Sequence, residues 1–363
     1  MSNNYNFCIC ICTYQRSQLV SNLIDDLFKQ TLVPAYLIVV DGDPNSGEVR
    51  NMLQRKNCPA NCQIYYLPSN HGNLAYQRYL GWRAAHMRDV NYLLYLDDDL
   101  RIYQPDTLET LISPMVRDIE VVGITAKPET GDVQEKFAEH PVLLDRDNAD
   151  KTPALARWFG ASRLTPPGGL TPFGERCPPV DSGDGYGSVE WLHGRVMLYR
   201  MTALGDDIFS EDLFAITHIH CGMGEDTFLS HRVSHRGKML LSFHSNFLHP
   251  HDALPNSYPI RAKKLGYAVA YSRRLLNDYY RGAPPSPRFS DRTTLIKSYL
   301  GNIYFAWWNS ILRPASHRFA YAWGYTLGAI RGMFQKPIAK KLTPNINWRQ
   351  DAEQALGKQV KIL

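Results

Sequence analysis

The sequence predicts an α/β fold with a mostly parallel central sheet, helices on both faces of the sheet, and a helical extension at the carboxyl end. Short, continuous apolar runs alternate with amphipathic stretches through the first part of the chain. Continuous apolar runs are typical of strands buried on both faces, and helices usually supply the crossovers between parallel strands. Ligands of such sheets bind at the carboxyl ends of the strands. We therefore expect the functional site at that edge.

Each element up to residue 97 follows from its own pattern. FCICIC is a short β-compatible run, and SQLVSNLIDDLFKQ places apolar residues at helical spacing along one face. YLIVVD is a β-branched run bounded by Pro34 and Gly42. The expected elements are strands at 7–12, 36–41, 63–67 and 92–97, and helices at 17–30 and 73–87.

The pattern changes after a further predicted strand at 121–125. Up to about residue 188 the chain is rich in Pro and Gly, which is typical of a functional lid or binding loop, or of a plain surface insertion. Regular structure resumes at 188–200, with a helix at 224–237 and a strand at 238–243. From residue 253 the chain is basic and helical.

Charge divides the chain into two parts. Residues 1 to 252 hold 22 Lys and Arg against 31 Asp and Glu (net −9), and residues 253 to 363 hold 18 against 4 (net +14). We predict a catalytic domain at 1–252, with a donor half at about 1–125 and an acceptor half at about 188–252, followed by a basic, aromatic-rich helical region at 253–363. Such a split suggests that the basic region meets an anionic surface, either nucleic acid or the cytoplasmic face of a membrane.

The start of the chain and its cysteines indicate a cytoplasmic protein. MSNNYN lacks the charged and apolar segments of a signal peptide, and no stretch approaches eighteen uninterrupted apolar residues. Seven cysteines do not form the even, dense framework of a small secreted domain. Cys8, Cys10 and Cys12 lie on one side of a strand, where parallel side chains cannot converge on zinc, so we interpret them as small buried hydrophobes.

Three consecutive carboxylates follow the strand YLLYLD. Asp97, Asp98 and Asp99 lie where ligands bind in such a sheet, and like charges so close together raise one another's pKa unless a cation intervenes. Mg²⁺ and Mn²⁺ suit hard oxygen ligands and often bridge carboxylates to substrate phosphates. The triplet therefore predicts a metal–diphosphate site, with a solvated turn as the alternative.

Five segments together resemble glycosyltransferase family 2. They are ICTYQR, LIVVDGDPNS, NHGNLAYQRYLG, YLDDD and GEDTFLSHRVSHRG, in the order and spacing of that family. The resemblance covers about the first 250 residues. It implies a GT-A, Rossmann-like fold and an inverting, nucleotide-sugar-dependent transferase, with a UDP-sugar as the favoured donor.

The resemblance assigns the donor side residue by residue. Thr13 and Tyr14 would approach the nucleoside, and Asp41 would accept hydrogen bonds from the base or ribose, or merely cap a strand end. Arg78 would reach the base or the phosphates, with a surface helix charge as its alternative, and Tyr79 departs from the family, where an Asn is common. Further donor-binding candidates are Arg16, Asp97 and Asp98.

The metal and catalytic roles follow from the same resemblance. Asp99 would bind Mn²⁺ or Mg²⁺ together with Asp97, and Asp98 would be turned away or bonded to backbone. His249, or else His251, would complete the metal site, although a structural role fits either histidine equally well.

Asp226 would be the general base that takes the proton of the acceptor hydroxyl, and Glu225 would orient it or bind the acceptor; charges at a helix start are the alternative. Trp191 and Gly194 would lie under the sugar and the acceptor, although Trp191 fits a core position equally well.

The acceptor is expected to be a glycan or a lipid-linked glycan. Residues 295–334, with apolar and aromatic faces and Lys/Arg flanks, fit an interfacial segment on the inner face of the cell membrane, or else helices that pack on the catalytic domain or another subunit. An oligomer is therefore possible, and no nucleic-acid-binding module is visible.

Three other functions share part of this pattern. A dTDP-rhamnose-dependent rhamnosyltransferase would share the fold. A non-catalytic nucleotide-sugar-binding module would not need both the aspartate triplet at 97–99 and the Glu225–Asp226 pair. A nucleotidyltransferase would carry a Gly-rich phosphate loop after the first strand, which TYQRSQ lacks.

Overall fold

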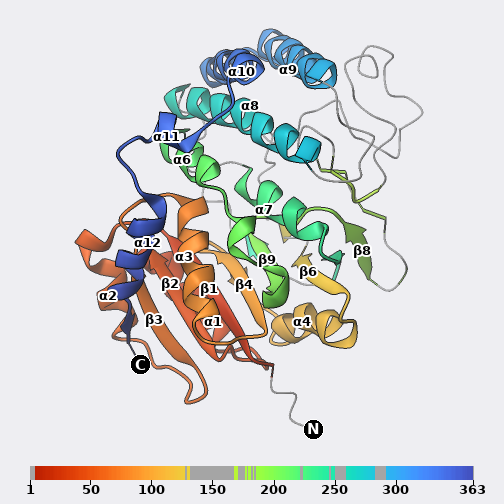
Figure 1. The fold of residues 1–363 in the computed structure, drawn as a ribbon. Helices are drawn as coiled ribbons and strands as arrows, with labels where there is room; N and C mark the ends of the chain where they lie inside the picture. The colour runs from red at the N-terminus through yellow and green to blue at the C-terminus, as the bar shows by residue number, and fades with distance from the viewer. Residues whose placement is uncertain are drawn as a thin grey trace.

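The structure is a computed structural model that describes residues 5–126, 129–130, 167–170, 176–177, 179–180, 183, 185–220, 224–244, 247–249, 259–282 and 292–362. Its centre is a nine-stranded sheet in the order β12-β3-β2-β1-β4-β9-β6-β10-β8 (Figure 1). The strands are β1 (Phe7–Thr13), β2 (Tyr36–Asp41), β3 (Gln63–Pro68), β4 (Tyr92–Asp97), β6 (Val121–Ala126), β8 (Tyr186–Val189), β9 (Val196–Arg200), β10 (Lys238–Ser242) and β12 (Val360–Lys361).

Most of these strands run in one direction. β3, β2, β1 and β4 are parallel neighbours. β9 is antiparallel to both β4 and β6, so β6 and its parallel neighbour β10 point the same way as β1. Only β9 and the edge strands β8 and β12 are reversed among the nine. The mostly parallel sheet predicted from the sequence is confirmed.

Helices cover both faces of the sheet, each over its own apolar core. α1 (Ser17–Leu27), α2 (Glu48–Leu53) and α4 (Thr107–Arg117) lie on one face. α3 (Leu74–His86), α6 (Glu211–His220), α7 (Glu225–Ser234) and α12 (Trp348–Gly357) lie on the other. The two crossover helices expected at 17–30 and 73–87 are confirmed as α1 and α3, and α2 was not predicted.

The alternation in β1 separates the two cores. Phe7, Ile9 and Ile11 point into the core under α1, while the three β1 cysteines point into the core under α3. A Cβ on Gly81 of α3 would lie 2.2 Å from Cys10 Sγ, so the helix approaches the strand closely at this point. Burial raises the pKa of the Cys8 thiol to about 12. The interpretation of these cysteines as small buried hydrophobes is confirmed.

A second, three-stranded sheet lies beside the aspartate triplet. It contains β5 (Arg101–Ile102), β11 (Phe247–His249) and β7 (Glu129–Thr130) in the order β5-β11-β7. β11 runs antiparallel to β5, with Leu248 opposite Arg101. Because β5 begins two residues after Asp99, this pairing brings the end of β11 close to the triplet.

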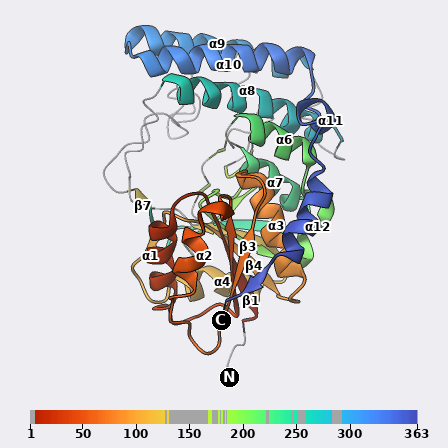
Figure 2. The same cartoon turned by 90° about the vertical axis from the view of Figure 1, so that its left-hand side faces the viewer.

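The carboxyl-terminal part forms a helical layer and then returns to the main sheet. α8 (Pro259–Gly282), α9 (Arg292–Leu312) and α10 (Ser316–Phe334) stack at the end of the molecule opposite the N-terminus (Figure 2). α11 (Ala339–Leu342) leads to α12, which packs against α3, and β12 pairs with β3. The helical extension is confirmed, and the domain boundary at residue 252 stays a prediction. No helix within the described ranges combines the length and the apolar content needed to cross a membrane.

Most of the Pro- and Gly-rich stretch, and also Cys221 and His251, lie outside the described residues. The choice between a functional loop and a surface insertion therefore stays open.

Candidate active site

The strand register gathers three predicted site residues at one edge of the sheet. Thr13 is opposite Asp41 in the β1–β2 pair, and Cys12 is opposite Asp97 in the β1–β4 pair. The side chains of Thr13, Asp41 and Asp97 therefore lie at the carboxyl ends of neighbouring parallel strands. In open α/β sheets, ligands bind at this edge.

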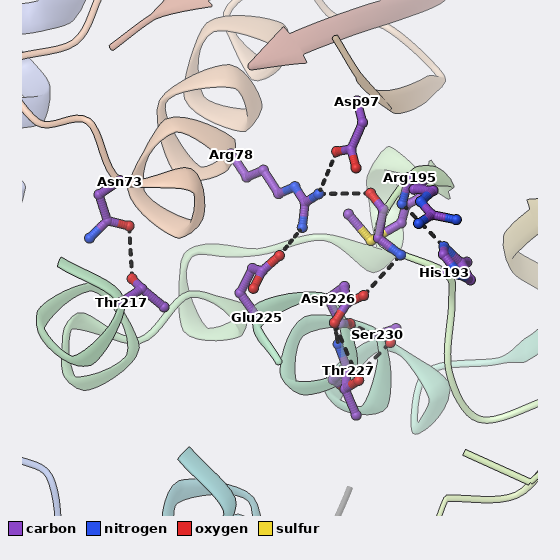
Figure 3. A network of polar contacts seen from close by, with 12 residues as sticks. Asn73, Arg78, Asp97, His193, Arg195, Thr217, Glu225, Asp226, Thr227 and Ser230 are labelled. Carbon is purple, nitrogen blue, oxygen red and sulfur yellow. Dashed lines mark hydrogen bonds and ion pairs between the residues drawn. The ribbon is translucent and has the colours of Figure 1, made fainter. Parts of the chain in front are cut away.

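Arg78 links this edge to the start of α7. Its side chain lies on α3, is only 2% exposed, and points between β4 and α7 (Figure 3). Nη1 donates to Glu225 Oε1 at 2.8 Å, and Nη2 donates to Asp97 Oδ1 at 3.2 Å and to the Gly194 carbonyl at 2.7 Å. Arg78 is thus a buried bridge between two carboxylates, and its alternative as a surface helix charge is wrong.

Burial raises the pKa of both carboxyls that Arg78 holds. Burial raises the pKa of Asp97 to about 7, with further upward contributions from Asp99 and Asp98, although the Arg78 guanidinium opposes the shift. Burial likewise raises the pKa of Glu225, again against the effect of Arg78. The guanidinium therefore stabilises charge that this buried site would otherwise disfavour.

Asp98 faces the first strand. Thr13 Oγ1 donates to Asp98 Oδ2 at 2.6 Å, and Arg16 Nη1 donates to Asp98 Oδ1 at 3.0 Å. Its buried carboxylate is held by these two side chains rather than by the backbone, and the turning of Asp98 away from a metal stays a prediction. Thr13 is itself buried and positions Asp98 from the end of β1.

Asp99 has the surroundings of a metal ligand. Its Oδ1 is buried and accepts no hydrogen bond from the described part of the chain, and it lies 3.4 Å from His249 Nε2. Burial acts to raise the pKa of Asp99, but the neighbouring His249 and Arg16 outweigh it and lower the pKa. A buried carboxylate oxygen beside an imidazole fits a divalent cation.

The described residues supply only part of a coordination sphere here. Within the described residues no group of three His, Cys, Asp or Glu side chains is arranged to hold a metal ion. Asp97 faces Arg78 instead of Asp99 and His249. Two protein ligands suit Mg²⁺ or Mn²⁺ held together with substrate phosphates, and this is the form in which these residues fit a metal.

Asp226 is the second residue of α7, and three groups hold its carboxylate. Its Oδ2 accepts the Gly194 N–H at 2.9 Å and pairs with Arg176, and its Oδ1 accepts the Thr227 N–H at 2.6 Å. Burial acts to raise the pKa of Asp226, but Arg176 and Arg78 outweigh it and hold the pKa well below its usual value. Asp226 is therefore ionised at neutral pH and carries no proton of its own.

Gly194 allows Asp226 this position. A Cβ at residue 194 would lie 2.6 Å from Asp226 Oδ2, closer than a side chain tolerates. Its carbonyl accepts from Arg78 and its N–H donates to Asp226. Gly194 therefore joins Arg78, at the carboxyl ends of the strands, to Asp226 of α7. The contact of Gly194 with a sugar stays a prediction.

The predicted nucleoside side contains Asp41 and Tyr14. Asp41 is buried and accepts from Tyr66 Oη at 3.0 Å and from the Asp43 N–H at 2.9 Å. Burial raises its pKa, although both donors oppose the shift. The Tyr14 ring is 52% exposed and lies over Gly42 and Gly72, where Cβ atoms would approach it within 3.1 Å.

Trp191 is mostly buried. Its Nε1 donates to the Cys177 carbonyl at 3.2 Å, and the Arg176 guanidinium lies 5.3 Å from its ring centroid. These contacts favour the core alternative, and a sugar-stacking role stays a prediction.

Sequence reasoning missed several residues of the site. Arg176 lies in the Pro- and Gly-rich stretch, where no periodicity marks it. Burial, followed by the charge of Arg176, lowers the pKa of His193 to about 3, so His193 is neutral beside Asp226. Gln77 joins β1 to β2 by donating to the carbonyls of Thr13 and Val40. His193 lies between the predicted Trp191 and Gly194, and Gln77 lies within the segment NHGNLAYQRYLG, so the sequence carried a signal for these two.

Comparison with known proteins gives one informative result. Residues 8–167 match the family model described as Glycosyl transferase family 2. No curated protein matches the sequence.

Several solved structures are similar at low identity. One is the mannosyltransferase PcManGT from Pyrobaculum calidifontis in complex with GDP-Man and Mn²⁺, with 11% identity, a TM-score of 0.48, and coverage of 91% of this chain and 88% of that one. Another is S. aureus TarS 1–349, with 14% identity, a TM-score of 0.43, and coverage of 90% of each chain. Likeness at this level carries no argument about donor or acceptor. Residues 8–167, less than half of the chain, thus resemble glycosyltransferase family 2, and the order of the sheet agrees with the mostly parallel α/β fold that the sequence predicted.

Proposed function

We propose that the protein transfers a sugar, with inversion, from a nucleotide donor to a hydroxyl of a glycan or lipid-linked glycan, and that a UDP-sugar is the favoured donor. One observation carries the proposal. Arg78 and Gly194 join Asp97, at the strand edge, to Glu225 and Asp226, at the start of α7, in a single buried network. A glycosyltransferase needs a site for the leaving diphosphate next to a group that takes the proton of the attacking hydroxyl, because the leaving group and the hydroxyl act on the same carbon.

The reaction assigned to this network is a single displacement. The acceptor oxygen forms a bond to the anomeric carbon while the bond from that carbon to the diphosphate oxygen breaks. Asp226 takes the proton of the acceptor hydroxyl, and the diphosphate leaves with the electron pair of the broken bond. Glu225, held by Arg78, orients this end of the site.

The donor side uses the residues at the ends of β1, β2 and β4. Tyr14 offers an exposed ring beside buried Asp41 for the nucleoside. Arg16 reaches both Asp98 and Asp99 and supplies a positive charge near the diphosphate. Asp99 and His249 would hold a divalent cation, which when bound neutralises diphosphate charge. Asp97 stays a predicted further ligand.

Donor binding tests the metal assignment without any turnover. We expect UDP to bind more tightly with Mn²⁺ than without it, and Asp99→Asn to remove that difference, because the buried Oδ1 loses its charge. Isothermal calorimetry with UDP, with and without Mn²⁺, measures both effects. The exposed-carboxylate variant Asp207→Asn serves as the control and should keep the metal dependence. Equal UDP affinity in both conditions would overturn the assignment.

Arg176 sets the pH range in which Asp226 can act. Removing its charge by Arg176→Gln raises the pKa of Asp226 towards its ordinary value, so a larger share of Asp226 is protonated in mild acid. Because only the ionised form accepts a proton, we expect the acid limb of the kcat/KM profile to move to higher pH. Arg236→Gln removes an arginine that pairs with Asp207, and its profile should stay unchanged. An unmoved acid limb in Arg176→Gln would contradict the role given to this pair.

The two alternatives predict different outcomes. A rhamnosyltransferase of the same fold would be stabilised by dTDP-rhamnose rather than by UDP-sugars, which a thermal-shift panel of nucleotide sugars with Mn²⁺ separates. At a concentration of 100 Kd, a true donor adds about 2.7 kcal/mol to the free energy of unfolding. A non-catalytic module would bind a donor and transfer nothing to any hydroxyl. The site chemistry supports the enzyme, and the proposed location is cytoplasmic, at the inner face of the cell membrane.

A further inference from the structure

The outer surface of the helical layer carries two apolar stripes. On α9 the exposed large apolar residues recur every three or four positions, and on α10 they recur at four, seven and four. Such spacing places each set on one side of its helix. Their exposed fractions range from 38% to 83%. The residues of this outer apolar face are Ile296, Leu300, Tyr304, Trp308, Ile311, Leu312, Phe319, Trp323, Ile330 and Phe334.

The packing of the layer turns both stripes away from the protein. α10 contacts α8 through Gly324 and Gly328, where added Cβ atoms would lie 2.0 and 2.4 Å from backbone oxygens of α8. The apolar stripe of α10 occupies the opposite side of that helix. On α9, Tyr299 faces inward and donates to the Ala270 carbonyl of α8 at 2.9 Å, while its neighbour Leu300 is exposed. Figures 1 and 2 both show α9 and α10 as the outermost layer.

The charge around the outer apolar face has one sign. Residues 292 to 350 contain no Asp or Glu and nine Lys or Arg. Exposed basic residues stand near both ends of α9, at Lys297 and Arg313. An apolar stripe with basic flanks suits a surface that offers acyl chains beneath anionic headgroups. A second copy of this chain would present the same positive charge, which disfavours self-association through this face.

The aromatic content favours the same partner. Tyr304 and Trp308 stack with their ring centroids 6.1 Å apart along α9, and Trp323 lies on the stripe of α10. Tyr and Trp are enriched at the boundary between headgroups and acyl chains, because each has an apolar ring and a polar group. Large exposed apolar patches on a folded protein mark an interaction site.

We propose that the outer apolar face of α9 and α10 binds the surface of an anionic phospholipid bilayer. The aromatic and aliphatic side chains enter the headgroup boundary, and the flanking Lys and Arg residues contact lipid phosphates. This binding does not depend on sugar transfer. It would hold the enzyme at the surface where a lipid-linked acceptor is found.

The test uses the full chain and two kinds of vesicle. We expect flotation with vesicles that contain phosphatidylglycerol, little flotation with pure phosphatidylcholine, and release at high salt because surface charge is screened. Trp308→Ser with Trp323→Ser should weaken the partition by about tenfold or more, since two half-exposed rings no longer enter the bilayer. Ile119→Ser removes an even more exposed apolar side chain elsewhere and should leave binding unchanged.

Several results would overturn the proposal. They are no flotation with anionic vesicles, equal binding to neutral vesicles, or a double variant that binds like the wild type. A wild-type dimer that the double variant converts to monomer, without vesicle binding, would instead show an interface between copies. UDP affinity, measured in the same double variant, should equal that of the wild type. This confirms that the variant is folded and keeps this test separate from that of the proposed function. If the double variant does not fold, Trp323→Ser alone and the charge reversal Arg313→Glu provide the same comparison.

Discussion

Arg78→Ala should lower the free energy of unfolding by about 3–5 kcal/mol, because it leaves the buried Glu225 carboxylate, the partly buried Asp97 carboxylate and a buried carbonyl without their shared donor. Asp97 and Glu225 already have raised pKa values with the guanidinium in place. Without it, each must take up a proton or bury an unpaired charge. Urea denaturation at neutral pH measures the loss, and Arg78→Lys should recover part of it.

Arg83 provides the matched control on the same helix. It pairs with Glu353 at 2.7 Å, but the Glu353 side chain is 61% exposed, so solvent screens the pair. Arg83→Ala should therefore cost less than about 1 kcal/mol. If Arg78→Ala costs no more than Arg83→Ala, the buried bridge does not hold the site together.

Much of the fold could be predicted because its strands are continuous apolar runs. FCICIC, YLIVVD and YLLYLD became β1, β2 and β4 with nearly the predicted bounds. β9 was not predicted as an antiparallel strand between β4 and β6, because direction and neighbours depend on packing rather than on local pattern. β12, only two residues long, owes its place to pairing with β3.

The candidate site was predicted in its parts but not in its connections. The sequence marks Asp97 and Glu225 as carboxylates in recognisable segments, yet nothing local indicates that Arg78 pairs with both, 19 and 147 residues away along the chain. The pairing of Arg176 with Asp226 is even less visible in the sequence, because Arg176 lies in a segment without periodicity. Long-range ion pairs of this kind come from tertiary packing, which a single sequence does not show.

Asp226→Asn should reduce the turnover number for sugar transfer by about 10²–10⁴-fold, because the acceptor hydroxyl loses the group that takes its proton. Asparagine has nearly the same shape, and its side-chain oxygen can still accept the Gly194 N–H. The donor edge, on the far side of Gly194 and Arg78, is unchanged. UDP affinity should therefore stay within the range of the wild type.

Two comparisons separate chemistry from structure in this variant. Asp207→Asn changes an exposed carboxylate that pairs with Arg236 and should transfer sugar at the wild-type rate. Thermal unfolding of Asp226→Asn reports any loss of folded protein, so that the rate can be compared per folded molecule.

The most direct measurement is the single-turnover rate of transfer in Asp226→Asn with the donor bound at saturation and the acceptor in excess. With Asp226 as the general base, UDP affinity is preserved and the transfer rate falls by at least about two orders of magnitude. A transfer rate near that of the wild type, with the donor equally bound, would show that another group takes the proton and would contradict the assignment.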